Sequence, residues 1–200
     1  MNIDRLVEVR DRAREILLKL DREFPYVHLG SSLAALDIIN VLIRVMRRDN
    51  GDCRDWFILS IGHVAPALYS ILAVEGLMPV ERLMEINQVS SVVSTHADNL
   101  DVPFIDATTG SLGQGLSIGV GLALANRARG CGDGVVYVLM GDGELNEGQP
   151  WEAAMTAVRY GLDNLVVIVS LNGYQLDGPT SMIKTVNYAR VFEAMECALW

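Results

Sequence analysis

The chain has 200 residues, half of them hydrophobic and 20% charged, with a formal net charge of −9. This composition excludes a disordered chain and suits one domain with a substantial core. The acidic balance and the lack of any Lys/Arg block argue against nucleic acid as a partner. Apolar runs are far shorter than the ~20 residues that span a bilayer, which argues against a membrane protein.

The three cysteines, Cys53, Cys131 and Cys197, are far apart in the sequence and form no CxxC or Cys/His metal spacing. This pattern predicts reduced thiols, and reduced thiols predict a cytoplasmic protein. The first twenty residues mix acids and bases and lack the apolar segment of a secretion signal.

The first half of the sequence predicts mostly helices. Apolar residues of the first segment recur on one stripe, which is typical of an amphipathic helix. A polar turn over 47–51 ends the second helix, and residues 80–109 are less regular. The elements expected here are helices over 3–20, 32–46 and 66–74 and a short buried strand over 56–60.

The second half predicts strands that alternate with helices. Residues 110–130 are rich in Gly and Ala and apolar almost all round, which indicates a helix buried on most sides. Residues 135–140 and 165–170 are apolar strands without alternation, and 148–160 is the helix between them. Such strands indicate a parallel sheet covered on both faces. The sequence therefore predicts one domain over 1–200, of the α/β class, with three αβα layers and a mainly parallel sheet.

Gly141-Asp142-Gly143 directly follows the strand predicted over 135–140. Ligands of open parallel sheets bind beyond the carboxyl ends of the strands. The two glycines allow backbone N–H groups to approach a phosphate, and the carboxylate between them suits a hard cation. By itself, an acidic glycine turn of this kind is more often a plain loop.

Asn172 follows the next strand, thirty positions after Asp142. Because parallel strands end at the same edge of a sheet, we expect these two side chains to lie close together. The backbone carbonyl of Tyr174 adds a third oxygen. Three protein oxygens, two diphosphate oxygens and water would complete an octahedral Mg²⁺ site, so the predicted metal ligands are Asp142, Asn172 and Tyr174.

Three blocks of the sequence, 59–69, 107–116 and 141–153, resemble the N-terminal subunit of split transketolases, and the likeness extends over roughly residues 24–200. The spacing from Gly141-Asp142-Gly143 to Asn172 is similar to the thiamine diphosphate motif. The resemblance implies a thiamine-diphosphate-binding fold, with thiamine diphosphate and Mg²⁺ as cofactors and ketol transfer as the activity. The cofactor-binding residues that it implies are His63, Gly110, Ser111, Leu112, Gly141, Asp142, Gly143 and Asn172.

The sequence contains three histidines, His28, His63 and His96, and each falls on a histidine position of that family. A lone histidine is more often structural. The resemblance implies that His28 and His96 are the catalytic, substrate-side residues and that His63 contacts the cofactor. A neutral imidazole is suited to remove the proton of a sugar hydroxyl and to orient the sugar.

Glu147 and Glu152 have two interpretations. Acids near a helix N-terminus are stabilised by the helix dipole. The resemblance implies instead that they connect the two active sites across a dimer, in subunit communication. The sequence leaves both open.

The resemblance also implies a partner. Activation of the cofactor requires a glutamate on a separate pyrimidine-binding domain, and 200 residues leave no room for it. We therefore expect a second, pyrimidine-domain subunit, self-association of this chain, and a heterotetramer acting on phosphorylated ketose and aldose substrates. The family continues beyond Trp200 with a further strand and histidine, so the chain is either short or truncated at its C-terminus.

Five positions depart from the usual split-transketolase pattern. Ile61 replaces a lysine, Leu29 and Ala97 replace prolines, Thr95 replaces a glycine and Ser170 replaces an aspartate. Most of them flank the substrate-side histidines, so the identity of the donor and the acceptor stays open.

Three other functions share some of these features. The thiamine-binding subunit of a 2-oxoacid dehydrogenase has the Gly-Asp-Gly to Asn spacing but not the block over 107–115 or the three histidines. Deoxyxylulose-phosphate synthase is normally one long chain. A non-catalytic partner that retains the fold is opposed by the intact Asp142 and Asn172.

Overall fold

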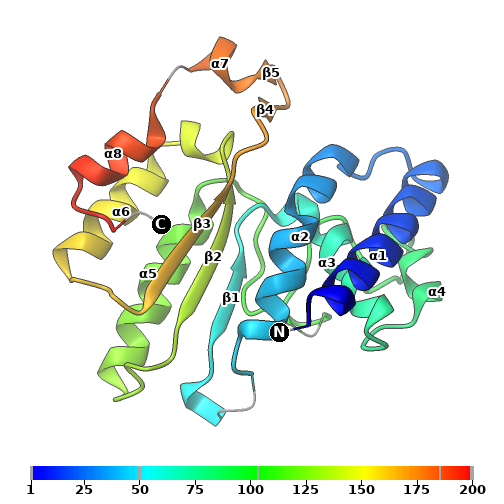
Figure 1. Cartoon of the computed structure of the whole chain (residues 1–200), viewed down its shortest axis with the longest axis horizontal. Coiled ribbons are helices and arrows are strands. Elements are labelled where there is room, and N and C mark those ends of the chain that lie inside the picture. The colour runs from blue at the N-terminus through cyan, green and yellow to red at the C-terminus, as the bar shows by residue number, and fades with distance from the viewer. Residues whose placement is uncertain (1, 49–50, 103, 185, 199–200) are drawn as a thin grey trace. The chain divides into compact units, whose positions relative to one another are not determined.

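The computed structural model describes residues 2–48, 51–102, 104–184 and 186–198. The chain forms two compact units (Figure 1), and each is described by itself. The first unit comprises residues 1–46 and 62–110, and the second comprises 47–61 and 111–200. The expectation of one domain over 1–200 stays an expectation. Within the described ranges, every helix is too short or too polar to cross a membrane.

The first unit is helical. Its elements are α1 (Ile3–Glu23), α2 (Leu29–Val45), the 3₁₀ turn η2 (Gly62–Val64), α3 (Ala65–Val74) and α4 (Val80–Leu83). The predicted amphipathic stripe of α1 is confirmed, because Val9, Ala13, Leu17 and Leu20 are fully buried. Helix α1 packs on both α2 and α3, and α3 is buried over its first eight residues. Helix α2 begins earlier than predicted, directly after His28.

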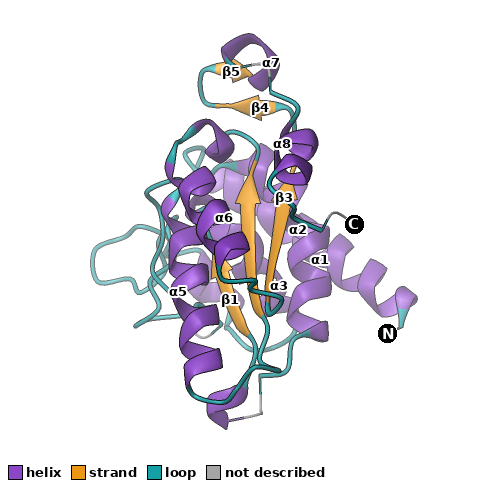
Figure 2. Ribbon diagram, turned by 90° about the vertical axis from the view of Figure 1, so that its left-hand side faces the viewer, coloured by secondary structure: helices purple, strands orange, loops and turns teal. Residues whose placement is uncertain are grey.

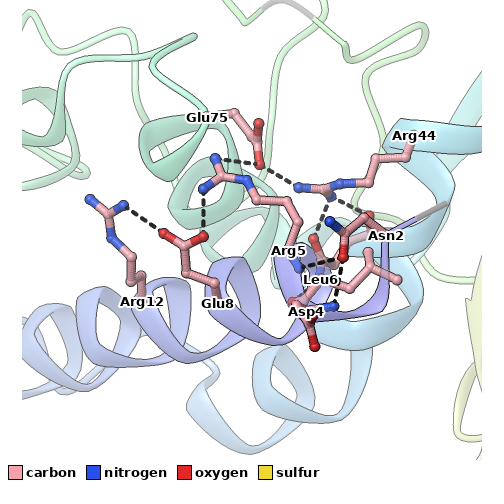
Figure 3. Close-up of polar contacts among 9 residues, drawn as sticks. Asn2, Asp4, Arg5, Leu6, Glu8, Arg12, Arg44 and Glu75 are labelled. Carbon is pink, nitrogen blue, oxygen red and sulfur yellow. Dashed lines mark hydrogen bonds and ion pairs between the residues drawn. The ribbon is translucent and has the colours of Figure 1, made fainter.

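Polar contacts join α1 to the ends of its two neighbours (Figure 3). Arg5 donates hydrogen bonds to Glu8 at 2.9 Å and to Glu75 at 3.4 Å. Arg44 of α2 also donates to Glu75, which follows α3. These side chains are partly exposed, so their ion pairs orient the helices more than they stabilise the unit.

The second unit is built on a parallel sheet with the strand order β1-β2-β3 (Figure 2). Its strands are β1 (Trp56–Leu59), β2 (Val136–Gly141) and β3 (Leu165–Ser170), and a hairpin of β4 (Tyr174–Gln175) and β5 (Gly178–Pro179) follows them. Its helices and 3₁₀ turns are η1 (Gly51–Cys53), α5 (Gln114–Ala128), η3 (Glu144–Asn146), α6 (Gln149–Arg159), α7 (Thr180–Ile183) and α8 (Tyr188–Ala194). The predicted parallel pairing is therefore confirmed.

Helix α5 packs against all three strands, and α6 packs against α5. The close approach requires glycine: a Cβ at Gly119 would lie 2.5 Å from Cγ2 of Val138, and one at Gly115 would lie 2.4 Å from Cβ of Ser60. The prediction of burial on most sides holds for one face, which includes Leu116. The remaining positions are half-buried or exposed.

The edge strand β3 differs from its prediction as a fully covered strand. Among the described strands, β3 pairs with β2 alone. Most of its residues are only half-buried, and Val166 is 39% exposed. The central strand β2 is largely buried, as its apolar sequence predicts. Continuous hydrophobicity therefore identifies both strands, but position in the sheet decides how much of each is covered.

The prediction of three reduced cysteines is wrong for two of them. Cys53 and Cys131 form a disulfide across 78 residues of sequence, and Cys197 is free. The physical reason is the parallel pairing of β1 and β2, which brings the segments that precede these two strands together. The cytoplasmic location stays a prediction, without the thiol argument on which it rested.

Candidate functional site

The first unit brings its three histidines together. His28 precedes α2, His63 lies in η2, and His96 lies in the loop after α4. The ring centroids of His28 and His63 are 4.7 Å apart, and those of His63 and His96 are 6.5 Å apart. The three imidazoles that the sequence assigned to one reaction therefore form one cluster.

The cluster favours neutral imidazoles. Burial, with smaller contributions from the nearby His28 and His96, lowers the pKa of His63 to about 4. Partial burial of its ring also lowers the pKa of His96, with a smaller contribution from His28. At pH 7 these two rings are therefore neutral, so that a ring nitrogen can accept a proton or a hydrogen bond.

Two glycines bring the backbone of residues 109–110 against the histidine cluster. A Cβ at Gly62 would lie 3.0 Å from the carbonyl carbon and oxygen of Thr109. Gly110 has φ of +151°, and a Cβ there would lie 3.1 Å from Cδ2 of the His96 ring. The structure thus places Gly110, a predicted cofactor-binding residue, directly beside a predicted catalytic one.

The departures next to His96 are accommodated locally. The Thr95 N–H donates to Oδ1 of Asn87 at 2.9 Å, and Nδ2 of Asn87 donates to the Thr95 hydroxyl at 3.2 Å. Ala97 is 1% exposed. The residues on either side of His96 are therefore fixed, one by a pair of hydrogen bonds and the other by packing.

In the second unit, the carboxyl ends of β2 and β3 meet as the sequence predicts. Gly141 pairs with Ser170, and the Asp142 N–H donates to the Ser170 carbonyl at 3.2 Å. Oδ2 of Asp142 accepts a hydrogen bond from the Gly173 N–H at 2.8 Å. Asp142 therefore contacts the residue that follows Asn172.

The residues at these strand ends fit a magnesium ion. Asp142 is 3% exposed, and no ion pair between described residues involves it. A buried carboxylate without a counter-charge is costly, and a divalent cation removes that cost. The other predicted ligands, the Asn172 amide and the Tyr174 carbonyl, are also oxygens, which Mg²⁺ prefers.

The hairpin that follows Asn172 holds its side chain in a turn. Oδ1 of Asn172 accepts a hydrogen bond from the Tyr174 N–H at 2.8 Å. The described residues contain no group of three His, Cys, Asp or Glu side chains that would hold a metal by themselves. A metal here would therefore depend on cofactor phosphates and water for several of its ligands.

The glycine N–H groups of the motif have partners within the chain. The Gly141 N–H donates to Oε2 of Glu144 at 3.3 Å, and the Gly143 N–H donates to Oδ1 of Asp142 at 3.1 Å. The sequence predicted that the two glycines allow these N–H groups to approach a phosphate, and that cofactor contact stays a prediction. In the structure, both N–H groups donate to carboxylates of the same turn. The motif's visible contribution is the placement of Asp142.

Glu144 was not among the predicted site residues. It is 1% exposed, and it accepts hydrogen bonds from the Ser60 hydroxyl and from the N–H groups of Gly113, at 2.7 Å, and Gly141. Burial raises its pKa, against the effect of these three donors. The sequence showed Glu144 only as one acid of the block over 141–153; its burial depends on residues more than thirty positions away.

Comparison with known proteins identifies the family. The model of the transketolase thiamine diphosphate binding domain matches residues 22–199. The chain belongs to the transketolase family. It is 41% identical over 161 residues to the 6-deoxy-6-sulfo-D-fructose transketolase subunit of Clostridium sp., covering 78% of this chain and 58% of that protein. It is 35% identical to an apulose-4-phosphate transketolase subunit of Phocaeicola vulgatus, covering 95% of this chain and 69% of that one.

Solved transketolases share the fold. The Campylobacter jejuni enzyme superimposes with a TM-score of 0.86 at 29% identity, over 98% of this chain and 32% of that one. A Pichia stipitis transketolase mutant gives 0.85 at 30% identity, over 98% and 31%. The predicted α/β fold of the thiamine-diphosphate-binding type is confirmed. The chain thus spans 58% of the Clostridium relative and about a third of these full-length enzymes.

The remaining predicted residues of this transketolase-family chain lie at helix starts in the second unit. Ser111 and Leu112 are exposed just before α5. Glu147 and Glu152 are exposed around the start of α6. Exposure agrees with both interpretations of the two glutamates, the helix dipole and subunit communication, and their role stays a prediction.

The segment after the hairpin packs back on the turn that follows the motif. Tyr188 of α8 donates to Oδ1 of Asn146 at 3.2 Å, and its ring stacks on Trp151 with centroids 6.0 Å apart. The sequence predicted neither the hairpin nor α7, because elements of two to four residues leave no readable periodicity. A pocket of about 400 Å³ lies here, lined by Leu145, Asn146, Glu147, Gly148, Trp151, Lys184, Val186 and Val191.

Proposed function

We propose that this chain is the N-terminal subunit of a two-component transketolase-type enzyme that transfers a ketol unit with thiamine diphosphate and Mg²⁺. The observation that carries the proposal is the cluster of His28, His63 and His96 in a member of the transketolase family. Neither a 2-oxoacid dehydrogenase subunit nor a fold-only partner calls for three imidazoles converging in this way. Intact Asp142 and Asn172 further support a catalytic subunit.

For the cofactor end of the site, we assign Mg²⁺ to Asp142, Asn172 and the Tyr174 carbonyl. The assignment is supported by the buried carboxylate of Asp142, which has no ion-pair partner among the described residues, and by the oxygen-only donor set. His63, with residues 110–112 and 141–143, would contact thiamine diphosphate. When bound, thiamine diphosphate supplies the nucleophilic carbon and the electron sink for carbon–carbon cleavage.

The histidines would handle protons and sugar hydroxyls. His28 and His96 are exposed and can reach a substrate, and a ring nitrogen of either can take the proton of the donor hydroxyl. His63 is half-buried with a pKa of about 4, so it stays neutral throughout the physiological range. A neutral ring there can donate from one nitrogen and accept at the other, which suits orientation more than charge neutralisation.

The relatives supply the basis for the partner and the substrate class. Two of them are named as transketolase subunits, one for 6-deoxy-6-sulfo-D-fructose and one for apulose 4-phosphate. We assign this chain an anionic ketose donor, a phosphate or a sulfonate, with an aldose acceptor. Its partner would carry the pyrimidine-binding domain and the activating glutamate, in a heterotetramer with a self-associated core of this chain.

The decisive experiment compares the isolated chain with the assembled complex. Both are given Mg²⁺, thiamine diphosphate, an aldose acceptor, and either ketose phosphates or 6-deoxy-6-sulfo-D-fructose. We expect ketol transfer by the complex and none by the isolated chain, because the carboxylate that activates the aminopyrimidine comes from the partner. Transfer by this chain without any partner would refute the split-enzyme proposal.

The histidine roles are tested in the same complex. His28→Ala and His96→Ala are expected to lower kcat by roughly 10²–10⁴-fold, the range for a lost acid–base group, while thiamine diphosphate affinity stays close to the wild-type value. Collapse of cofactor affinity with normal residual turnover would show that these residues bind the cofactor instead.

A further inference from the structure

The proposed reaction assigns no role to the buried carboxylate of Glu144. Glu144 is 1% exposed and directly follows Gly141-Asp142-Gly143, and none of the roles assigned above uses it. Burying a carboxylate is costly unless hydrogen bonds or a cation compensate it. No ion pair between described residues includes Glu144, so its compensation comes from hydrogen bonds.

The three donors to Glu144 come from three different elements. Ser60 directly follows β1, Gly113 is the N-cap of α5, and Gly141 is the last residue of β2. Oε1 accepts from the Ser60 hydroxyl and from the Gly113 N–H at 2.7 Å, and Oε2 accepts from the Gly141 N–H at 3.3 Å. One carboxylate therefore ties two strand ends and a helix start together.

The packing around this carboxylate leaves little room for adjustment. A Cβ at Gly115, in the first turn of α5, would lie 2.2 Å from the Ser60 hydroxyl oxygen. Gly113 has φ of +93°, and a Cβ there would lie 3.0 Å from Cβ of Glu147. The start of α5 is thus pressed against the end of β1. The negative charge of Glu144 also lies at the positive end of the α5 dipole, which stabilises it there.

We propose that Glu144 is a positioning residue for the metal ligand Asp142. Gly141 precedes Asp142, and its N–H donates to Oε2 of Glu144, while the N–H of Asp142 donates to the Ser170 carbonyl. Glu144 thereby sets where the chain leaves β2 and where the Asp142 carboxylate lies. This inference rests on the proposed function, since it takes Asp142 as the Mg²⁺ ligand.

A glutamine cannot replace Glu144 in this arrangement. Glu144→Gln keeps the size of the side chain, and its amide oxygen can still accept the two hydrogen bonds that Oε1 receives. Its NH₂ group then faces the Gly141 N–H, and two donors oppose each other. The substitution therefore breaks the contact to Gly141 selectively and leaves those to Ser60 and Gly113 in place.

The test uses the assembled complex and measures thiamine diphosphate and Mg²⁺ affinity by calorimetry. We expect E144Q to weaken the apparent Mg²⁺ affinity about 10- to 100-fold, the effect of losing a hydrogen bond to a charged group. At saturating Mg²⁺ and cofactor, kcat should return to within about threefold of wild type, because the chemistry itself is untouched. Hydrogen exchange of the segment around Gly141 should become faster in E144Q without any cofactor.

The matched control is Asp55→Asn, a second isosteric change of a buried carboxylate in the same unit. Asp55 is 2% exposed and lies before β1, at the opposite strand end from Ser60. It should lower stability without changing the Mg²⁺ requirement. Equal effects of D55N and E144Q on Mg²⁺ affinity would overturn the positioning role, as would an E144Q complex that binds Mg²⁺ like wild type.

A milder variant covers the case in which E144Q fails to assemble. Ser60→Ala removes one neutral donor from Oε1 and should raise the Mg²⁺ requirement by only about threefold; no change would count against the network. If the wild-type complex binds no thiamine diphosphate, the proposed function fails by itself. The exchange rate at Gly141 still decides separately whether Glu144 fixes that peptide.

Discussion

The two ends of the parallel sheet in the second unit surround their buried carboxylates with different hydrogen-bond donors, charged at one end and uncharged at the other. Before β1, Asp55 is 2% exposed and accepts hydrogen bonds from Arg47 and from the Val135 N–H, each at 2.9 Å. After β2, Asp142 and Glu144 are 3% and 1% exposed, and the groups that donate to them are N–H and O–H groups without charge. At the amino end, Arg47 neutralises the charge of Asp55. At the carboxyl end, Asp142 and Glu144 have no positively charged partner among the described residues.

This difference separates the end of the sheet that stabilises the unit from the end that suits ligand binding. The amino end also carries the Cys53–Cys131 disulfide, so β1 and β2 are joined there by a covalent bond and an ion pair. The carboxyl end lacks such closure among the described residues, and it is the end at which open parallel sheets bind ligands. A buried carboxylate without a counter-charge at that end suits a bound cation.

The largest effect is expected from removing the charge at the carboxyl end. Asp142→Ala should abolish Mg²⁺-dependent thiamine diphosphate binding in the complex, because about 3–5 kcal/mol of cation pairing is lost, more than about 100-fold in affinity. Calorimetry measures this directly. Asp177→Ala, an exposed acid of the following hairpin, is the control and should bind normally. Unchanged affinity in D142A would remove the metal site from this end of the sheet.

At the amino end, the disulfide should be the strongest single contribution to stability. Cys131→Ser is expected to lower the free energy of unfolding by about 2–4 kcal/mol under oxidising conditions and to have little effect under reducing ones. Denaturant unfolding with and without a reductant measures both values. Cys197→Ser, which lies outside the disulfide, should match wild type in both. Equal stability of C131S and wild type under oxidising conditions would contradict the bond.

Breaking the ion pair at the amino end should cost slightly less. Asp55→Asn is expected to lower the free energy of unfolding by about 2–3 kcal/mol, below the full cost of a buried pair because Arg47 is 44% exposed. Thermal unfolding records the change, and calorimetry should show an unchanged thiamine diphosphate affinity. A loss of cofactor affinity in D55N would show that the two ends are not functionally separate.

The smallest effect concerns pH, and the two ends should respond with opposite signs. Burial alone would raise the pKa of Asp55, but hydrogen bonds from Arg47 and Val135 outweigh it and hold that pKa below 3.8. Its stabilisation is present above pH 3.8 and is lost as the pH falls through the lower, folded-state value. Burial raises the pKa of Glu144 above 4.5, so protonation of Glu144 favours the folded state as the pH falls.

Unfolding curves between pH 6 and pH 3 distinguish the two carboxylates. D55N should flatten the loss of stability at and below pH 3.8, whereas E144Q should steepen the net loss, since it removes the opposing contribution. Parallel curves for both variants would mean that the two ends do not differ in this way.

Local patterns in the sequence were enough to identify the sheet and its motif. The apolar run over 165–170 coincides with β3, and that over 135–140 differs from β2 by one residue at each end. The βαβ geometry then predicted that Asp142 and Asn172 lie close together. The structure brings Asp142 beside Gly173, the residue after Asn172. These features depend on residues close in sequence, whose hydrophobicity and turn chemistry can be read directly.

The histidine cluster depends partly on the sequence and partly on the tertiary packing. The family resemblance assigned roles to His28, His63 and His96, but their ring-to-ring distances depend on how α2, η2 and the loop after α4 pack. The lowered pKa of His63 is a consequence of that packing, since its first cause is burial. The residue type was available from the sequence, and the protonation state was not.

By itself, the sequence determined the α/β class, the family and the Asp142 and Asn172 strand ends of this protein, because short-range periodicity and motif spacing encode them. Only the tertiary structure decided that Cys53 pairs with Cys131 and that Glu144 is buried among Ser60, Gly113 and Gly141. These contacts join segments that are distant in the chain. Strand pairing and helix packing determine which residues meet in these contacts. The burial and desolvation that result cannot be read from the local sequence.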